Sequence, residues 1–368
     1  TPPHDREGGD TVKITRTTPT LTALGALVMG AALLAVAGCA PSSAQAGGEK
    51  VTELRLGYFA NVTHAPALVG VSQGLFDDAL GDIDVETTVF NAGPAAVEAL
   101  SAGAIDATYI GPSPAINTFI QSGGASAVIV AGATSGGASL VVRDGIDDPG
   151  DLDGANLATP QLGNTQDVAL RAWLADEGLA TSTTGGGDVT ITPTENAQTL
   201  ALFQRGELDG AWLPEPWASR LVLEQGAHVL VDEADLWPDG EFPTTVLLVR
   251  ADFAEQHPDV VSDLLTAHVE AVAWLGEHAD EAPAVINEAL QDATGKTLPD
   301  DVLDRALENV TFSVDPHADT FATLVDDGVS AGTQRDGPID GRFDLRALNK
   351  ILGDAGDTPV SASGLGED

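Results

Sequence analysis

The stretch GAIDATYIGPSP (residues 103–114) recurs in altered form as GELDGAWLPEP (residues 206–216). In both copies a glycine follows a helix-forming run, a short apolar strand ends at or near an aromatic residue, and prolines open the next helix. Around each copy, short apolar segments alternate with amphipathic ones, which is typical of parallel sheets covered by helices. The repeat therefore predicts two related α/β lobes.

The expected strands and helices fall into two sets, one for each lobe. The first set has strands at residues 54–58, 84–90, 107–110 and 127–131, with helices at residues 65–74, 94–102 and 114–121. The second has strands at residues 155–159, 189–193, 211–213 and 228–231, with helices at residues 165–177, 196–205 and 217–225. Beyond residue 258 the apolar positions follow helical spacing. Because ligands of open α/β sheets bind beyond the carboxyl ends of the strands, the segments after these strands are the candidate site.

The chain is strongly acidic. Of its 368 residues, 16 are Lys or Arg and 56 are Asp or Glu, so the formal net charge is −40. Such a field repels phosphates, which makes nucleic acid and anionic membrane surfaces poor partners. A content of 43% hydrophobic and 20% charged residues excludes a disordered chain and a multi-span membrane protein. Adaptation to high salt and GC-rich codon usage both explain the acidity.

The beginning of the sequence has the features of an export signal. Residues 21–37 are apolar and uncharged, and this run is shorter than the ~20 residues that span a membrane. The VAGC that ends at Cys39 resembles a bacterial lipobox, in which the cysteine is lipidated and becomes the new N-terminus. We therefore expect a signal peptide at residues 1–38, a flexible tether at residues 39–52, and an extracytoplasmic protein anchored to the cell membrane by Cys39.

Two further expectations concern this region. The sequence starts at Thr1 and its single methionine, Met29, lies inside the apolar run, so we expect translation to start at Val12 through a non-AUG codon. Residues 1–11 would then not be translated, which N-terminal sequencing of the precursor would check. Because Cys39 is the only cysteine, we expect the exported part to fold without a disulfide.

Three separate blocks of sequence resemble one family of proteins. FNAGPAAVEALSAGAIDATYIGPSPAI (residues 90–116), ATPQLGNTQDVALRAWL (residues 158–174) and AWLPEPWASRLV (residues 211–222) are similar to substrate-binding proteins of ABC transporters. The subgroup is the one for aliphatic sulfonates, taurine and nitrate, which is related to the NMT1/THI5-like proteins. The resemblance covers roughly residues 54–275.

This resemblance implies an α/β protein with the type II periplasmic-binding-protein fold, in which two lobes joined by two crossover segments enclose a ligand cleft. We expect lobe 1 at residues 53–140 plus 246–352, lobe 2 at residues 141–245, crossovers at residues 138–143 and 244–250, and a disordered tail at residues 353–368. The resemblance also implies a monomer that delivers a small organic ion, an aliphatic sulfonate or taurine-like compound, to an ABC permease and its ATPase subunit. A thiamine pyrimidine precursor, nitrate, bicarbonate and a THI5-like enzyme remain as alternatives.

Two turns between a strand and a helix are candidate anion sites. In the second lobe, Gly163 permits a tight turn and Asn164 or Thr165 can cap the following helix, whose first N–H groups are free for an anion. Gly111 and Ser113 have the same arrangement in the first lobe. Ordinary helix capping without a ligand explains each turn equally well. From these turns the predicted ligand-binding residues are Gly111, Ser113, Gln161, Gly163, Asn164, Thr165 and Gln166.

Other candidates follow further strands. The resemblance implies that the loop after the first strand contacts ligand, which selects Tyr58, Asn61 and His64, although a single histidine near a helix start is often structural. Thr134 and Ser135 offer hydroxyl groups after the fourth strand. Trp212 would cover an organic ligand or belong to the core.

Glu215, which lies between two prolines, is the one acidic candidate. Its carboxylate would repel a bare sulfonate or nitrate but would pair with a ligand amine. A bond to local backbone N–H groups, or a place at the rim, is the alternative. Because no Arg or Lys lies in these motifs, we expect neutral donors to hold any anionic head group.

The sequence favours neither an enzyme nor a metal site. Residues 147–154 are rich in Asp and Gly but lack the spaced ligands and terminal Glu of a calcium loop. No metalloprotease, phosphate-loop or serine-hydrolase motif is present. The THI5-type enzymes hold pyridoxal phosphate on a lysine and carry a cysteine-rich motif, whereas this chain has no Lys between Lys50 and Lys296 and no Cys there. We expect no cofactor and no metal.

Overall fold

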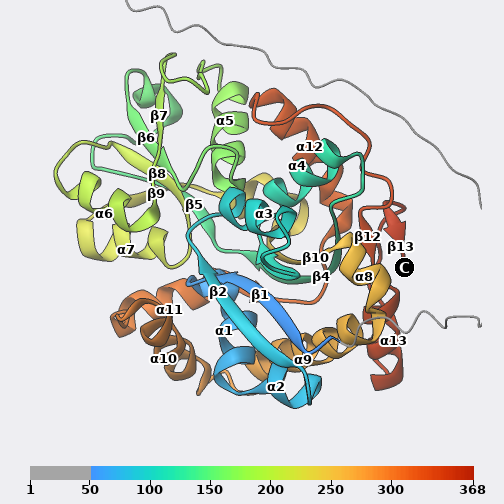
Figure 1. The fold of residues 1–368 in the computed structure, drawn as a ribbon. Coiled ribbons are helices and arrows are strands. Elements are labelled where there is room, and N and C mark those ends of the chain that lie inside the picture. Colours follow the sequence, from blue (N-terminus) through green and yellow to red (C-terminus); the bar gives the residue numbers. More distant parts are fainter. Residues whose placement is uncertain (1–50) are drawn as a thin grey trace, which may run out of the picture. The chain divides into compact units, whose positions relative to one another are not determined.

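The computed structural model describes residues 51–368 of the chain. The predicted signal peptide, the translation start, the lipid site at Cys39 and most of the tether lie outside the described residues. Two sheets, each accompanied by helices, organise the described part (Figure 1). Within it, no helix is long and apolar enough to cross a membrane.

The larger sheet has the strand order β13-β12-β4-β10-β3-β1-β2, and β11 pairs with β4. Strand β1 is parallel to β2 and β3, whereas β10 is antiparallel to both β3 and β4. Its strands are β1 (Glu53–Phe59), β2 (Asp84–Phe90), β3 (Ala107–Ile110), β4 (Ala127–Gly136), β10 (Pro243–Arg250), β11 (Val310–Phe312), β12 (Phe343–Asp344) and β13 (Gly366–Glu367).

The smaller sheet has the order β7-β6-β8-β5-β9. This order matches β2-β1-β3-β10-β4 strand by strand, with the same parallel and antiparallel pairs, which confirms the two related α/β lobes. Its strands are β5 (Ala138–Val142), β6 (Asn156–Thr159), β7 (Thr190–Pro193), β8 (Gly210–Pro214) and β9 (His228–Asp232).

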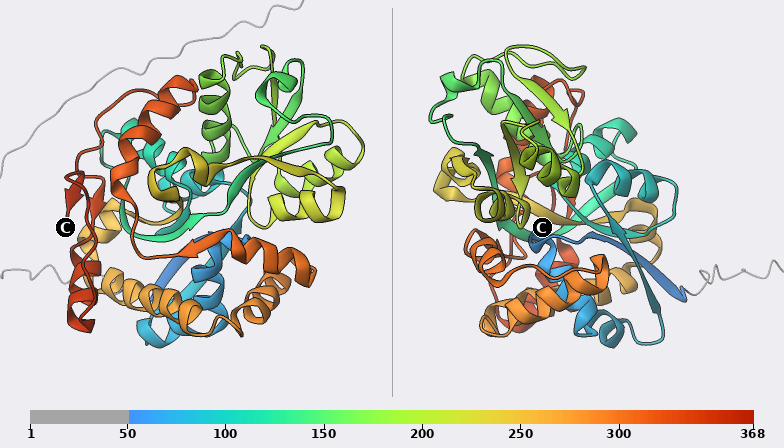
Figure 2. Two further views of the ribbon diagram at one scale, coloured as in Figure 1. Left: turned by 180° about the vertical axis from the view of Figure 1, so that it is seen from behind. Right: turned by 90° about the vertical axis from the view of Figure 1, so that its left-hand side faces the viewer.

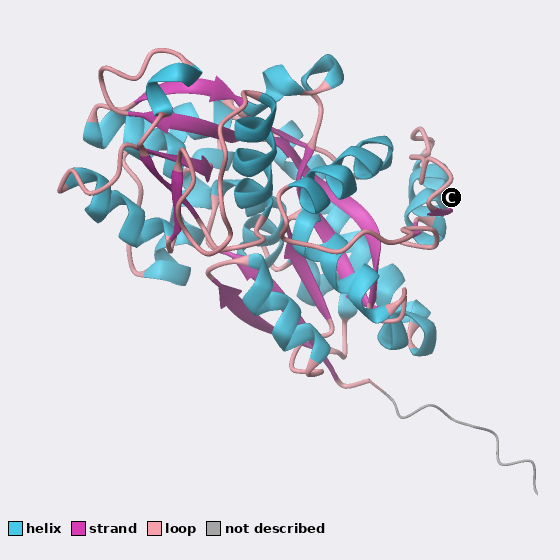
Figure 3. Cartoon of the chain, turned by 90° about the horizontal axis from the view of Figure 1, so that it is seen from above, coloured by secondary structure: helices cyan, strands magenta, loops and turns pink. Residues whose placement is uncertain are grey.

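Helices lie beside both sheets (Figure 3). Those that follow strands of the larger sheet are α1 (Ala65–Ser72), α2 (Leu75–Leu80), α3 (Gly93–Ser101) and α4 (Pro112–Ser122). Those of the smaller sheet are α5 (Thr165–Asp176), α6 (Asn196–Gln204) and α7 (Trp217–Gln225). The C-terminal part contributes α8 (Ala251–Gln256), α9 (Pro258–Glu277), α10 (Ala282–Thr294), α11 (Asp300–Glu308), α12 (Phe321–Ser330) and α13 (Arg346–Ala355).

The repeat extends to side-chain contacts at the start of the third strand of each lobe. Asp106 and Asp209 each accept the backbone N–H of a residue in the neighbouring first strand, at 3.1 and 2.9 Å. Arg250 at the end of β10 lies 3.2 Å from Asp106, and Arg143 after β5 lies 3.4 Å from Asp209. These equivalent contacts fix β3 and β8 in the same register, so that the loops after them occupy equivalent places.

The chain passes between the sheets close to the predicted positions, but the boundaries differ. It leaves the larger sheet at Gly137, between β4 and β5, and returns to it at Pro243. The predicted boundaries at residues 140 and 245 fall inside strands β5 and β10. We therefore define lobe 1 as residues 51–136 with 243–368, and lobe 2 as residues 138–242.

The prediction of a disordered tail from residue 353 is wrong. Helix α13 continues to Ala355, and Gly366 and Glu367 pair with β12 in the larger sheet. Ala362 is fully buried in the core of lobe 1. The tail is ordered because its last residues add a strand to the sheet, a tertiary contact that its Gly-rich and Asp-rich composition does not reveal.

C-terminal helices of lobe 1 contact lobe 2 at two places. Helix α11 packs against α7, and α12 packs against α5. In Figure 2 the C-terminal part, drawn in orange and red, runs from the α10–α11 end of the molecule to α12. The two lobes are therefore closed on each other in this structure.

Candidate functional site

A small polar cavity lies where the carboxyl ends of the two sheets face each other. Its volume is about 20 Å³, enough for a group the size of a water molecule. Amide and hydroxyl side chains dominate its lining, and no Lys, Arg, Asp or Glu of the described residues belongs to it. The lining residues are Phe59, Asn61, Thr63, His64, Asn91, Gly111, Pro160, Asn164, Thr165, Gln166, Asn196, Pro214 and Thr244.

His64 supplies a neutral donor to this cavity. The ring stacks on Phe59 with 4.4 Å between centroids, and its Nδ1 accepts the backbone N–H of Phe59 at 3.3 Å. Burial lowers the pKa of His64 to about 3, so the ring is uncharged at neutral pH. Since Nδ1 accepts a hydrogen bond, the ring hydrogen resides on Nε2, which is left to donate to a ligand.

The buried carboxylate of Asp167 holds the turn before α5 in place. Asp167 accepts the N–H of Gly163 at 2.9 Å and the hydroxyl of Thr159 at 2.9 Å, and its charge is paired with Arg171 at 3.1 Å. Gly163 has a φ of 75°, which favours glycine at this position. The N–H of Asp167 bonds to the carbonyl of Asn164 at 3.0 Å, and the two residues that begin α5, Thr165 and Gln166, line the cavity, where the first N–H groups of a helix lack partners within the helix.

The first turn of α4 faces this helix from the other lobe. Gly111 is the N-cap of α4, and the N–H of Ser113 lies 3.4 Å from the hydroxyl oxygen of Thr165. A Cβ atom added at Gly111 would lie only 2.3 Å from the same hydroxyl oxygen. The two predicted anion turns are thus brought together across the cleft, with no room between them for a larger residue.

Three more hydrogen bonds join the lobes around the cavity. Asn164 accepts the N–H of Gly93 at the start of α3, at 3.1 Å. Asn61 accepts the indole N–H of Trp217 at 2.7 Å. Asn91 donates to Glu195 at 3.2 Å. The cavity therefore has the N-termini of α3, α4 and α5 around it and amide side chains from both lobes across its opening.

Six of the predicted residues line this cavity, and one lies beside it. Ser113 is buried next to the cavity, and its hydroxyl oxygen has no partner among the described residues. Gly163 shapes the turn without lining the cavity. The predicted residues that line the cavity are Asn61, His64, Gly111, Asn164, Thr165 and Gln166.

The structure places the other predicted residues elsewhere. Tyr58 points into the core of lobe 1, because it follows the buried Leu54 and Leu56 at the two-residue spacing of a strand. Thr134 donates its hydroxyl to the carbonyl of Thr63, and Ser135 accepts the N–H of Phe242. Gln161 is exposed to solvent outside the cavity.

Trp212 belongs to the core of lobe 2 and does not cover the cavity. It is fully buried, lies against Trp173 with 6.0 Å between ring centroids, and donates its indole N–H to Glu233 at 2.7 Å. Burial raises the pKa of Glu233 to about 7, although the bond from Trp212 opposes the rise.

Glu215 is a structural link between the lobes. One carboxylate oxygen accepts Nδ2 of Asn309 at 2.7 Å and faces Arg305 at 3.2 Å, and the other accepts the N–H of Ser219 at 3.1 Å. Burial raises its pKa, while these three partners oppose the rise. Both oxygens are engaged and the residue does not line the cavity, so this structure shows the alternative, a bond to a local backbone N–H, while pairing with a ligand amine stays a prediction.

Asn91 and Asn196 line the cavity but were not predicted from the sequence. Asn91 follows β2 and Asn196 follows β7, which are equivalent strands of the two lobes. Applying the rule about carboxyl ends of strands to these two strands would have found both. Thr244 belongs to the returning strand β10, for which the sequence offered no such rule.

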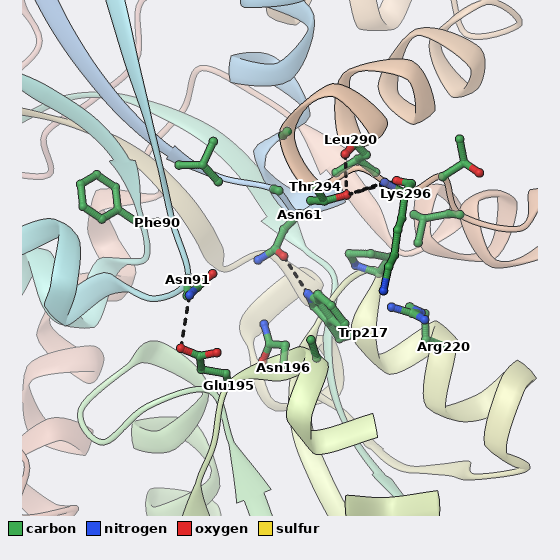
Figure 4. A pocket seen from close by; sticks show the side chains of 17 residues that line it. Asn61, Phe90, Asn91, Glu195, Asn196, Trp217, Arg220, Leu290, Thr294 and Lys296 are labelled. Carbon is green, nitrogen blue, oxygen red and sulfur yellow. Dashed lines mark hydrogen bonds between the residues drawn. The ribbon is translucent and has the colours of Figure 1, made fainter. Parts of the chain in front are cut away.

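A wider groove of about 370 Å³ adjoins the cavity (Figure 4). The cavity and the groove share Asn61, Asn91 and Asn196. The groove also lies between the lobes, with α10 and the following loop on one side and the first turns of α6 and α7 on the other. Its charged lining residues are Glu195, Arg220 and Lys296.

Comparison with known proteins connects this geometry to one family. Residues 47–289 match the model of the NMT1-like family. A Bacillus subtilis (strain 168) protein whose name assigns it to aliphatic sulfonate binding is 27% identical over 89% of this chain and 92% of its own length. The taurine-binding periplasmic protein of Escherichia coli (strain K12) is 30% identical over 56% of this chain and 62% of its own length.

Solved structures agree on the fold. The alkanesulfonate-binding protein SsuA from Xanthomonas axonopodis pv. citri, bound to MOPS, is similar with a TM-score of 0.66 and 22% identity, over 78% of this chain and 96% of that one. The nitrate-binding protein NrtA from Synechocystis PCC 6803 has a TM-score of 0.65 at 20% identity, over 76% and 81% of the two chains. The two-lobed fold expected from the sequence is thereby confirmed.

Proposed function

Because the chain belongs to the NMT1-like family, we propose that it is the solute-binding component of an ABC importer and captures a small organic anion of the sulfonate class. It passes this anion to a membrane permease that works with an ATPase subunit. The chain acts outside the cytoplasm, held at the membrane by lipidated Cys39, and binds the anion without transforming it. The names of its relatives, which include sulfonate-binding and taurine-binding proteins, support this proposal.

The chemistry of the small cavity carries the proposal, in which the lobes part slightly around a sulfonate, because the cavity of about 20 Å³ holds only a group the size of a water molecule. Helix N-termini from both lobes surround it, and the dipole of each favours a negative charge. The Nε2 hydrogen of His64, the amide of Gln166 and the hydroxyl of Thr165 add neutral donors. A sulfonate stays ionised at physiological pH and needs several such donors, whereas an ammonium group would find no carboxylate here.

The adjoining groove favours an organic anion over nitrate. A nitrate ion would leave the groove of about 370 Å³ unused, whereas the carbon chain of a sulfonate would extend into it past Asn61 and Asn196. A ligand held in this way contacts both lobes, which is the condition for a ligand to stabilise the closed form.

Calorimetric titration with butanesulfonate and with butylammonium tests the proposal. We expect butanesulfonate to bind and to raise the midpoint of thermal unfolding, and butylammonium to do neither. Gln166→Ala should weaken sulfonate binding by roughly tenfold, a loss of about 1.4 kcal/mol. The matched control, Gln198→Ala on the exposed face of α6, should bind like the wild type. Binding of butylammonium without binding of any sulfonate would overturn the proposal.

A further inference from the structure

Two positively charged side chains face each other across the groove described above. Lys296 follows α10 in lobe 1, Arg220 lies on α7 in lobe 2, and both line the groove. In Figure 4 the side chain of Lys296 extends toward the guanidinium group of Arg220. The chain has only 16 Lys and Arg residues against 56 acidic ones, so two cations at one groove are unlike the rest of the surface.

The two cations differ in their present partners. Arg220 donates two hydrogen bonds to Glu224, at 2.8 and 3.1 Å, and lies over the ring of Trp217, with 5.1 Å to its centroid. Lys296 has no carboxylate within 4.0 Å of its amino group among the described residues. The acid of the groove, Glu195, is engaged by Asn91 and lies away from the cation pair in Figure 4.

The lining of the groove is mostly apolar. It is formed by side chains of both lobes, so a hydrocarbon segment would lose contact with water on both sides there. These side chains are Val89, Phe90, Trp217, Leu290, Ala293 and Leu298. The neutral-donor cavity thus adjoins a groove that has a mostly apolar lining and two cations at its surface.

We propose that the ligand is a dianion: an organosulfonate whose carbon chain lies in the groove and whose far end carries a second anionic group, bound between Lys296 and Arg220. This inference rests on the proposed function, since it assumes that the sulfonate occupies the small cavity. The second anion would contact one cation from each lobe, so it would add to the stabilisation of the closed form. It would also explain why two like charges are directed at each other.

The test compares two dianions with a monoanion of similar chain length. Calorimetric titrations of the full chain use 4-sulfobutanoate, propane-1,3-disulfonate and butanesulfonate. The variants are Lys296→Met, Lys296→Met with Arg220→Met, and the control Lys350→Met, whose lysine lies on α13 and is paired with Asp354. We expect at least one dianion to bind the wild type about tenfold more tightly than butanesulfonate, as charge-assisted hydrogen bonds would provide.

The variants separate this inference from the proposed function. Lys296→Met should remove at least half of the difference in log Kd between the dianion and butanesulfonate, and the double variant should remove all of it. The Kd for butanesulfonate should stay within twofold of the wild-type value in every variant. Equal affinity for dianions and butanesulfonate in the wild type, or equal weakening of both by Lys296→Met, would overturn the dianion site while leaving sulfonate binding intact. Absence of binding by all three compounds would overturn the proposed function and this inference together.

Discussion

Replacing Gly111 by alanine should block closure of the lobes without disturbing the fold of either lobe. Gly111 has extended backbone angles, with φ −68° and ψ 153°, which alanine adopts freely. In the closed structure the new Cβ would lie 2.3 Å from the hydroxyl oxygen of Thr165 on the opposite lobe. Thr165 would have to rotate, losing the Ser113 N–H and withdrawing its hydroxyl from the cavity, or the lobes would have to separate.

The magnitude follows from the cost of overpacking. An overlap of this kind costs about 1–3 kcal/mol, so the Kd for butanesulfonate should rise roughly 5- to 150-fold. Loss of the glycine N-cap should lower the thermal midpoint of the unliganded protein only slightly. Gly276→Ala, where an added Cβ meets nothing within 4 Å, is the control and should bind like the wild type.

A double-mutant cycle with Thr165→Ala identifies the cause. Removing the hydroxyl leaves the Cβ of residue 165 at 3.4 Å from the new methyl group, a distance that a small shift accommodates. Gly111→Ala should therefore weaken binding far less in the Thr165→Ala background than in the wild type. Equal losses in both backgrounds, measured by calorimetry, would refute the steric argument, as would wild-type affinity of Gly111→Ala itself.

Three further predictions concern buried titratable groups. Because the pKa of His64 is about 3, the affinity for butanesulfonate should stay within twofold from pH 8 to pH 5. His64→Ala should lower that affinity roughly tenfold. A steep rise in affinity toward pH 5, measured by calorimetry, would show that the histidine titrates there. Burial raises the pKa of Glu233 from 4.5 to about 7, so the native state binds the proton more tightly and stability falls as pH rises through this window. Urea unfolding should show that the free energy of unfolding falls by about 3 kcal/mol over this window, and Glu233→Gln should abolish that fall. Equal pH profiles for the wild type and the variant would contradict this. Glu215→Gln should leave the ratio of taurine to ethanesulfonate affinity unchanged, since Ser219, Arg305 and Asn309 occupy the carboxylate, whereas a tenfold shift against taurine would place that carboxylate on the ligand.

Sequence reasoning succeeded where the signal was local or repeated. The spacing of apolar segments predicted every strand from β1 to β9 except β5, which was assigned to a crossover, and the repeat predicted that the two lobes share one plan. The glycine-containing turns before α4 and α5 were both predicted as candidate anion sites, and the structure brings them together at Gly111 and Thr165. Turn chemistry of this kind depends on neighbouring residues, which a single sequence displays.

The errors arose where distant contacts decide a residue's place. Trp212 lies on β8 and Glu215 directly follows it, close to Pro214, which lines the cavity. Their side chains nevertheless bond to Glu233 and Arg305, away from the cavity. Both partners come from segments that the repeat does not include. The last residues of the chain were expected to be disordered because the strand they pair with, Phe343–Asp344, is too short to be found by periodicity.

The lobe boundaries illustrate a related limit. Residues 138–143 and 244–250 were predicted as crossover segments, yet β5 (residues 138–142) and β10 (residues 243–250) are strands of the sheets that they enter. The sequence shows the change of sheet only as a short stretch of Thr, Ser and Gly, residues 134–137, between the apolar residues of β4 and those of β5. Only Gly136 and Gly137, with φ of 76° and 73°, mark the place where the backbone turns from one lobe to the other.

The position of a bound sulfonate would show whether the small cavity is the binding site. The chain has one methionine and one cysteine, Met29 and Cys39, so residues 51–368 contain no sulfur. In crystals grown with butanesulfonate, long-wavelength anomalous diffraction should therefore show the ligand sulfur as a single peak within this part of the chain. We expect that peak at the small cavity, beside Thr165 and Gln166 at the start of α5 and within reach of His64 Nε2. A peak beside Lys296 in the groove, or outside both lobes, would contradict it.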